Sequence, residues 1–167
     1  MSVKSRQYEN ITFYGDDYNR VRNFLIELDS HNYHYGRWDW MLTFFGSDWA
    51  DVDKLGKIGI WEENGKIVAI ATYDTKLGSA FLLALKGYEN LKEEMFFYAK
   101  TNLAKDGNFR VLILDGDLEM QNIAAQNNSF PTQEKESDAV YPIDLAKIKY
   151  TLPDRFKITS LAEEFDP

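Results

Sequence analysis

The sequence predicts an α/β domain in which helices flank a mixed central sheet. Two patterns support this prediction: three consecutive strand-like runs joined by short turns, and then an alternation of helix and strand. Short turns between neighbouring runs favour an antiparallel meander, whereas a helix between two strands favours a parallel pair. The expected order of elements is therefore β-α-α-β-β-β-α-β-α-β.

The first elements are expected to be one strand and two helices. The β-branched and aromatic run Ile11–Tyr14 is typical of a strand. Apolar residues then recur at three- and four-residue steps up to Ser30, as in an amphipathic helix. Asp16 or Asp17 is placed to cap the first turn of this helix. A short second helix is expected over Trp38–Phe45, where the apolar residues share one helical face.

The next three strands are expected to form the meander. Ile58–Glu63 and Lys66–Tyr73 flank the dipeptide Asn64-Gly65, and Asn-Gly accepts the positive φ that a type I′ turn requires at both central positions. The second strand is apolar on both faces, which predicts that it lies inside the sheet. A turn at Lys76–Gly78 leads into a third strand, Ser79–Leu85.

The rest of the chain predicts two helices and two strands. The first helix runs from about Leu91 to Lys105 and is followed by a buried strand, Val111–Leu114. Asp117 is expected to cap a helix over Leu118–Gln126. A last strand is expected over residues 130–143.

Composition narrows the classes of function. The 167 residues suffice for one domain with a substantial core, and 44% hydrophobic with 28% charged residues is typical of a soluble globular protein. A net charge of −8 argues against a nucleic-acid binder, which needs a basic face. The absence of cysteine excludes a disulfide scaffold and a cysteine nucleophile, and fits a reducing cytoplasm. With no long apolar run, we expect neither a membrane span nor a secretory signal.

Four segments of the chain agree in order and spacing with one known family. They are Tyr18–Glu27, Gly36–Met41, Lys57–Tyr73 and Ser129–Ser137. On these segments the sequence resembles the GNAT (Gcn5-related N-acetyltransferase) family, and more narrowly the N-terminal half of bacterial two-domain GNAT proteins. The resemblance covers most of the chain from Ile11 to about Leu152.

The resemblance implies transfer of an acetyl group from acetyl-coenzyme A (acetyl-CoA) to an amine. In the family, backbone N–H groups of a loop with the pattern Arg/Gln-x-x-Gly-x-Gly/Ala hold the cofactor pyrophosphate, between the fourth strand and the third helix. In this chain the loop falls at Ala84–Glu89. The implied cofactor-binding residues are Leu83, Leu85, Gly87 and Tyr88.

Two family signatures are altered in this sequence. Within the loop only Gly87 matches, because Ala84 stands in place of Arg or Gln and Glu89 in place of the last small residue. The family tyrosine that protonates the departing thiolate corresponds to Ala125, so we assign no catalytic residue. The implied acceptor-groove residues are His34, Trp38 and Tyr73.

Two other patterns each have a structural and a functional interpretation. His31 and His34 have the spacing of two metal ligands. Asp29 or Asp39 offers a third ligand, but packing or a polar rim is favoured and no metal is expected. The run Asp115–Asp117 is similar to the Asp-x-Asp of HAD-type phosphohydrolases, but the long downstream core of those enzymes is missing, so helix capping is favoured.

A weak internal repeat bears on domain organisation. Ile11–Tyr18 and Ile158–Phe165 share Ile-Thr, two carboxylates and an aromatic residue at matching positions. We therefore expect a GNAT-like domain over residues 11–152, and a linker with the possible first strand of a second, truncated GNAT repeat over residues 153–167.

Two functions stay open at this level. One is an acetyl-CoA-dependent N-acetyltransferase acting on the amine of a small molecule or peptide. The other is a catalytically degenerate GNAT-like module, with a degraded CoA loop, that packs on or assists a second GNAT domain in cis. Neither nucleic acid nor a membrane is expected as a partner.

Overall fold

The computed structural model describes residues 2–9, 14–28, 38, 50–73, 75–135 and 151–157. The chain divides into two compact units, Met1–Phe130 and Pro131–Pro167. In the second unit the described residues include one turn, in which the Phe156 N–H donates to the Pro153 carbonyl at 3.1 Å. No helix among the described residues has the length and apolar character needed to cross a bilayer.

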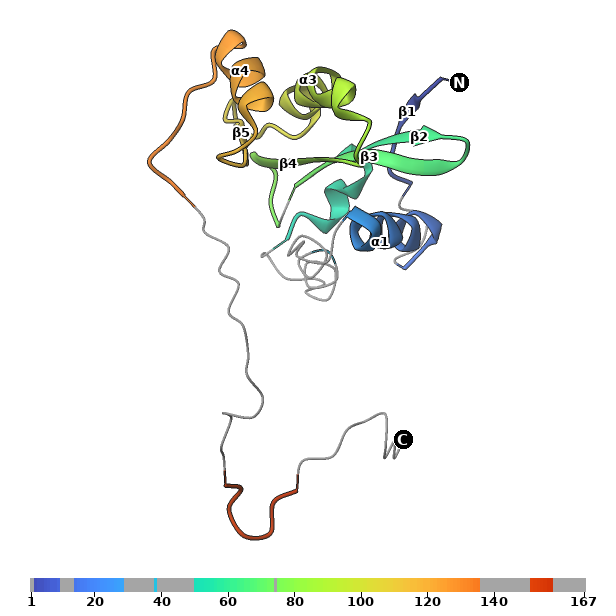
Figure 1. The fold of residues 1–167 in the computed structure, drawn as a ribbon, viewed down its shortest axis with the longest axis vertical. Helices are drawn as coiled ribbons and strands as arrows, with labels where there is room; N and C mark the ends of the chain where they lie inside the picture. Colours follow the sequence, from blue (N-terminus) through green and yellow to red (C-terminus); the bar gives the residue numbers. More distant parts are fainter. Residues whose placement is uncertain are drawn as a thin grey trace. The chain divides into compact units, whose positions relative to one another are not determined.

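The first unit is built on a five-stranded sheet with the strand order β1-β2-β3-β4-β5 (Figure 1). The strands are β1 (Lys4–Gln7), β2 (Gly59–Glu63), β3 (Lys66–Tyr73), β4 (Ser79–Ala84) and β5 (Arg110–Val111). The first three pairings are antiparallel and the pairing of β4 with β5 is parallel. The α/β class, and a meander followed by a parallel step, are therefore confirmed.

Helices cover both faces of this sheet. They are α1 (Asp16–Leu28), α3 (Lys92–Asn102) and α4 (Leu118–Gln126), with short 3-10 helices η1 (Val52–Lys57) and η2 (Glu89–Leu91). In Figure 1, α1 lies on one side of the sheet, and α3 and α4 lie on the other.

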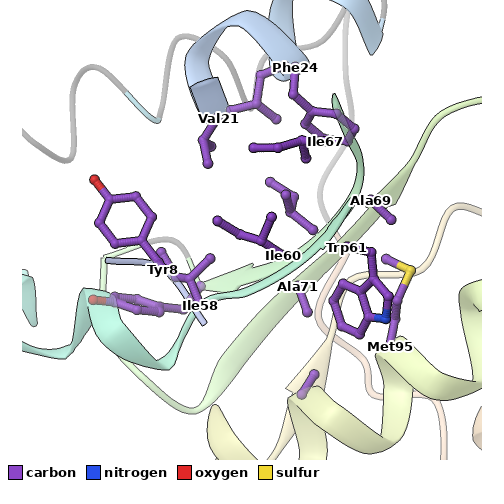
Figure 2. Packing of buried hydrophobic residues seen from close by; sticks show 14 of the residues in the cluster. Tyr8, Val21, Phe24, Ile58, Ile60, Trp61, Ile67, Ala69, Ala71 and Met95 are labelled. Atoms are coloured by element: carbon purple, nitrogen blue, oxygen red, sulfur yellow. The ribbon is translucent and has the colours of Figure 1, made fainter. Parts of the chain in front are cut away.

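The central strands β2 and β3 are covered by helices on both faces, and β3, which contacts both α1 and α3, is therefore apolar along nearly its whole length. Figure 2 shows Val21 and Phe24 of α1 facing Ile60 on one side of the sheet, while Met95 of α3 lies beside Trp61 on the other. All five side chains are at most 3% exposed. Successive residues of a strand point to opposite faces, so a strand between two helices has no face left for polar residues.

The hairpin between β2 and β3 forms as predicted. Asn64 has φ 53° and Gly65 has φ 77°, the two positive values of a type I′ turn. The cap of α4 is also confirmed, because the Asp117 carboxylate accepts from the Met120 N–H at 3.1 Å. Asp117, which belongs to the Asp-x-Asp run Asp115–Asp117, thus caps the helix as predicted.

The first strand corrects one prediction. A strand was expected over Ile11–Tyr14, whereas β1 lies at Lys4–Gln7 and Tyr14 is in a turn. Residues 11–13 lie outside the described residues. The polar run of β1 shows no apolar alternation because it is an edge strand whose residues are mostly exposed. Backbone pairing with β2, which the sequence does not display, determines its conformation.

A network of charged groups joins β1, α1 and β2. The Arg6 guanidinium donates to both carboxylate oxygens of Asp17, at 2.7 Å and 2.6 Å, and to Glu62 at 2.8 Å. Arg20 of α1 donates to the same Glu62 carboxylate at 2.5 Å. The Glu9 N–H donates to Asp17 at 2.7 Å. The Asp17 side chain, 5% exposed, therefore has partners on both oxygens.

This network also corrects the expected helix cap. Asp16 and Asp17 are both within α1, so neither is its N-cap. The first backbone bond runs from the Asn19 N–H to the Gly15 carbonyl at 3.3 Å. The Asp17 carboxylate is directed to Arg6 of β1 because a charged partner stabilises a buried carboxylate more than a helix terminus does.

Three further elements differ in extent from the sequence prediction. The predicted strand Val111–Leu114 is paired only at Arg110 and Val111. Residues 130–135, the described part of the predicted last strand, contain no strand. The predicted second helix lies outside the described residues except for Trp38, which is helical.

Candidate functional site

The two ends of β4 differ in their pairing with β5. Ser79 pairs with Arg110 and Ala80 with Val111, and the Leu112 N–H donates to the Ala80 carbonyl at 3.0 Å. The described residues show no β4–β5 pairing beyond this point. Beyond Ala80, the edge of β4 that faces β5 therefore has no strand partner among the described residues, and this half of β4 is paired with β3 alone.

Strand geometry shows which backbone groups lie on this unpaired edge of β4. Backbone N–H and C=O groups of successive residues point to opposite edges of a strand. The Ala80 carbonyl points toward β5, so the backbone groups of Leu82 and Ala84 point to the same edge. The Leu85 N–H points the other way and donates to the Val68 carbonyl of β3 at 2.9 Å. The unpaired edge of β4 thus carries the N–H and C=O groups of Leu82 and Ala84.

A tight turn follows β4, directly after its unpaired edge. The Tyr88 N–H donates to the Leu85 carbonyl at 3.1 Å, and Gly87 has φ 95°. A positive φ at the third position of a turn is characteristic of type II and requires glycine there. The geometry of the turn, rather than side-chain packing, explains Gly87, since nothing lies within 4 Å of the position that a Cβ would take.

The Gly87 amide already has a partner within the loop. Its N–H donates to both carboxylate oxygens of Glu89, at 3.1 Å and 2.9 Å. The hydrogen bond from the Gly87 N–H holds the pKa of the Glu89 carboxyl below its usual value of 4.5. The loop amide expected to bind phosphate therefore binds an internal carboxylate.

Tyr88 connects the turn after β4 to strand β2. Its hydroxyl donates to a Glu63 carboxylate oxygen of β2 at 2.7 Å, and this hydrogen bond raises the pKa of the tyrosine. The Tyr88 side chain thus ties the loop to the β2–β3 hairpin. Local sequence patterns do not predict this pair, because the two residues lie 25 positions apart.

A cavity of about 490 Å³ lies beside the same loop, between the start of α3 and α4. It is lined by Glu89, Asn90, Lys92, Glu93, Glu119, Asn122, Ile123 and Gln126. The Lys92 ammonium donates to Asp117 at 2.8 Å and lies 3.0 Å from a Glu119 oxygen. Because carboxylates already pair with its lysine, the cavity is acidic.

Trp38 and Tyr73, two of the residues predicted for the acceptor groove, are buried in the main core. Trp38 is 3% and Tyr73 is 2% exposed, and His34 lies outside the described residues. Tyr73 pairs with Ala80, at the end of β4 where β5 is still attached. The structure therefore does not bring Tyr73 together with Gly87, and a role for these residues at an acceptor groove stays a prediction.

Trp38 is part of an aromatic cluster. Its ring stacks on Tyr18 at a centroid distance of 6.1 Å and meets Tyr8 edge-on at 6.0 Å. Burial raises the pKa of Tyr8 to about 12. The Tyr8 hydroxyl and the Trp38 indole N–H are buried without a hydrogen-bond partner in the described structure. The Tyr73 hydroxyl donates to the Asp51 carbonyl.

The predicted cofactor residues share one region. Leu83 pairs with Ile70, Leu85 bonds to Val68, and both side chains are partly buried against the main core. Gly87 and Tyr88 follow in the turn. No group of three side chains suited to a metal ion occurs in the described part of the chain, and His31 and His34 lie outside it.

No protein-family model and no curated protein matches the sequence. The chain is similar to solved structures of the aminoglycoside N-acetyltransferase AAC(6')-Iy, one in complex with a bisubstrate analog and one with CoA. These share 12% identity over 86% of this chain and cover 99% and 95% of theirs, with TM-scores of 0.36 and 0.37. It is also similar to the aminoglycoside acetyltransferase meta-AAC0020 from an uncultured soil metagenomic sample, in complex with sisomicin. That structure shares 14% identity over 84% of this chain and 95% of its own, with a TM-score of 0.34.

Proposed function

We propose that the chain is a GNAT-like N-acetyltransferase module that takes its acetyl group from acetyl-CoA and passes it to an amine. The unpaired edge of β4 beyond Ala80 is the observation that supports this proposal. An extended chain of amides, such as the pantetheine arm of CoA, can add to a free strand edge by backbone hydrogen bonds. The N–H and C=O groups of Leu82 and Ala84 offer such an edge beside the turn at Gly87.

The two parts of the cofactor fit this chain differently. The pantetheine arm fits the edge of β4, where the backbone donors and acceptors of Leu82 and Ala84 have no strand partner among the described residues. The pyrophosphate does not fit the loop as it stands, because the Gly87 N–H is bonded to Glu89 and the adjoining cavity is acidic. Binding of the whole cofactor therefore requires a change at Glu89.

The acceptor proposed for this module is the amine of a small molecule or a peptide. An amine with a pKa near 10 is cationic at neutral pH. The net charge of −8 favours the approach of a cation to the protein surface. The same charge disfavours nucleic acid as a partner.

A second candidate function is a non-catalytic GNAT-like module that assists a further GNAT domain in cis. The occupied Gly87 amide favours this candidate. So does Ala125 of α4, which is exposed and stands where the family carries its tyrosine. Under this proposal residues 153–167 would lead into the further domain.

Calorimetric titration of the chain with acetyl-CoA tests the first candidate. The matched variant is Ala84→Pro, which removes the Ala84 N–H from the unpaired edge of β4 and removes no donor to β3. We expect saturable binding by the natural chain and at least about tenfold weaker binding by Ala84→Pro, since lost backbone pairing costs about 1.4 kcal/mol. Circular dichroism controls for folding. Absence of binding, or equal binding by a folded Ala84→Pro variant, would contradict the proposal and favour the non-catalytic module.

A further inference from the structure

The turn after β4 holds a carboxylate where the proposed function requires a phosphate. Glu89 lies two positions after Gly87, and its carboxylate accepts from the Gly87 N–H through both oxygens, at 2.9 Å and 3.1 Å. Because the two residues are so close in sequence, this bond costs little conformational entropy. The described residues provide no ion pair within 4 Å for Glu89, so the backbone amide is its principal partner.

The charged residues around the loop also disfavour a bound phosphate. Glu93 and Glu119 line the same cavity as Glu89, whereas Lys92, its one lysine, is paired with Asp117 and Glu119. Both Glu89 and Glu93 lie at the start of the α3 region, where the partial positive charge of the helix stabilises anions. A phosphate entering the cavity would meet the like charge of Glu93 and Glu119, which Lys86 of the turn and the carboxylate-paired Lys92 offset only in part.

Exposure distinguishes Glu89 from a structural carboxylate. Its side chain is exposed, and so is the hydrogen bond to Gly87. An exposed bond of this kind contributes little net free energy, so a stronger ligand can displace the carboxylate.

We propose that Glu89 is a specificity-determining residue that selects against phosphate-bearing ligands by occupying the Gly87 amide. The inference rests on the proposed function only in taking this loop as the one that faces the pyrophosphate of the acyl donor. A donor with a pyrophosphate must displace Glu89, whereas pantetheine, which lacks phosphate, binds along β4 without contact with it. Removal of the Glu89 carboxylate therefore strengthens binding of CoA and leaves binding of pantetheine unchanged.

Calorimetry with CoA and with pantetheine tests this inference on three forms of the chain: natural, Glu89→Ala and Glu93→Ala. Glu93 is the matched control, because it lines the same cavity and carries the same charge but makes no hydrogen bond to the loop. We expect Glu89→Ala to bind CoA at least about tenfold more tightly than the natural chain, the size of one charge-assisted bond. Glu93→Ala should change the affinity by less than about threefold. Equal gains in the two variants would overturn the inference, and so would a gain for pantetheine in Glu89→Ala.

A second readout separates this inference from the proposed function. Inorganic pyrophosphate is titrated into the ¹⁵N-labelled chain, and the Gly87 amide resonance is followed by NMR. We expect pyrophosphate to shift this resonance in Glu89→Ala and to leave it nearly unchanged in the natural chain and in Glu93→Ala. This result with no CoA binding by any form would support the inference and contradict the proposed function. Equal shifts in the natural chain and Glu89→Ala would overturn the inference.

Discussion

Asp17 and Glu89 are two carboxylates that both accept a backbone N–H, yet they have opposite surroundings. Asp17 is buried and also binds the Arg6 guanidinium through both oxygens. Glu89 is exposed and binds the amide of Gly87 within its own loop. The first joins segments far apart in the sequence and the second joins neighbours. The comparison indicates that the Asp17 bond maintains the fold, whereas the Glu89 bond is displaceable.

The largest effect is expected at Asp17. The variant Asp17→Ala leaves Arg6 without its bidentate partner and the Glu9 N–H without an acceptor, so we expect a loss of about 3 kcal/mol in the free energy of unfolding. Urea denaturation measures this loss. Asp16→Ala is the control, because the Asp16 side chain is 86% exposed and its removal should cost less than about 0.5 kcal/mol. Similar losses in both variants would show that Asp17 contributes no more to stability than an exposed carboxylate does.

A pH dependence should accompany the Asp17 effect. Burial raises the pKa of Asp17, but hydrogen bonds from Arg6 and from the Glu9 N–H outweigh burial and hold it below the usual 3.8. The stabilisation is therefore fully present above about pH 4 and is lost as the pH falls through the lowered value. Urea denaturation between pH 6 and about pH 2.5 should show a steeper decline for the natural chain than for Asp17→Ala. Parallel declines would show that Asp17 has no lowered pKa.

Asp117 is expected to give an intermediate effect. It caps α4 through the Met120 N–H and pairs with Lys92, but its side chain is 28% exposed. We expect Asp117→Ala to lower the free energy of unfolding by about 1 kcal/mol, the usual cost of a lost N-cap. Asp117→Asn keeps a cap acceptor, and it should retain most of the stability in the same denaturation experiment. If Asn proves as costly as Ala, the pair with Lys92 matters more than the cap.

The smallest effect on stability is expected at Glu89. Because its bond is local and exposed, Glu89→Ala should change the free energy of unfolding by less than about 0.5 kcal/mol. Thermal or urea denaturation checks this value alongside the binding experiments. A loss of more than about 1 kcal/mol would show that the carboxylate holds the loop in place and is not simply displaceable.

Several elements were predictable because their causes are local. Asn64-Gly65 supplies the two positive φ values of the hairpin turn, and Asp117 lies where the first turn of α4 needs an acceptor. The apolar run of β3 predicts burial on both faces, as Figure 2 shows for Ala69 and Ile67. Each signal lies within a few residues of the structure it specifies.

The candidate site was predictable only in part. The position of the loop at Gly87 followed from the order of elements and from the family resemblance. The end of the β4–β5 pairing at Ala80 did not, because Val111–Leu114 has the sequence of a longer strand and only its tertiary surroundings limit the pairing to Arg110 and Val111. The sequence shows that Glu89 replaces the last small residue of the family loop, but the bond of its carboxylate to the Gly87 N–H required coordinates.

The sequence by itself determined the α/β class, the meander and the helix cap at Asp117. These depend on periodicity, turn chemistry and capping, which act over a few residues. Tertiary structure decided that the polar run Lys4–Gln7 is a strand and that the Asp17 carboxylate binds Arg6. It also decided that the pairing of β4 with β5 ends at Ala80. Each of these depends on partners distant in sequence, such as Glu62, which lies 56 positions from Arg6. Local sequence does not encode which distant groups will meet, and their pairing arises only when the sheet assembles.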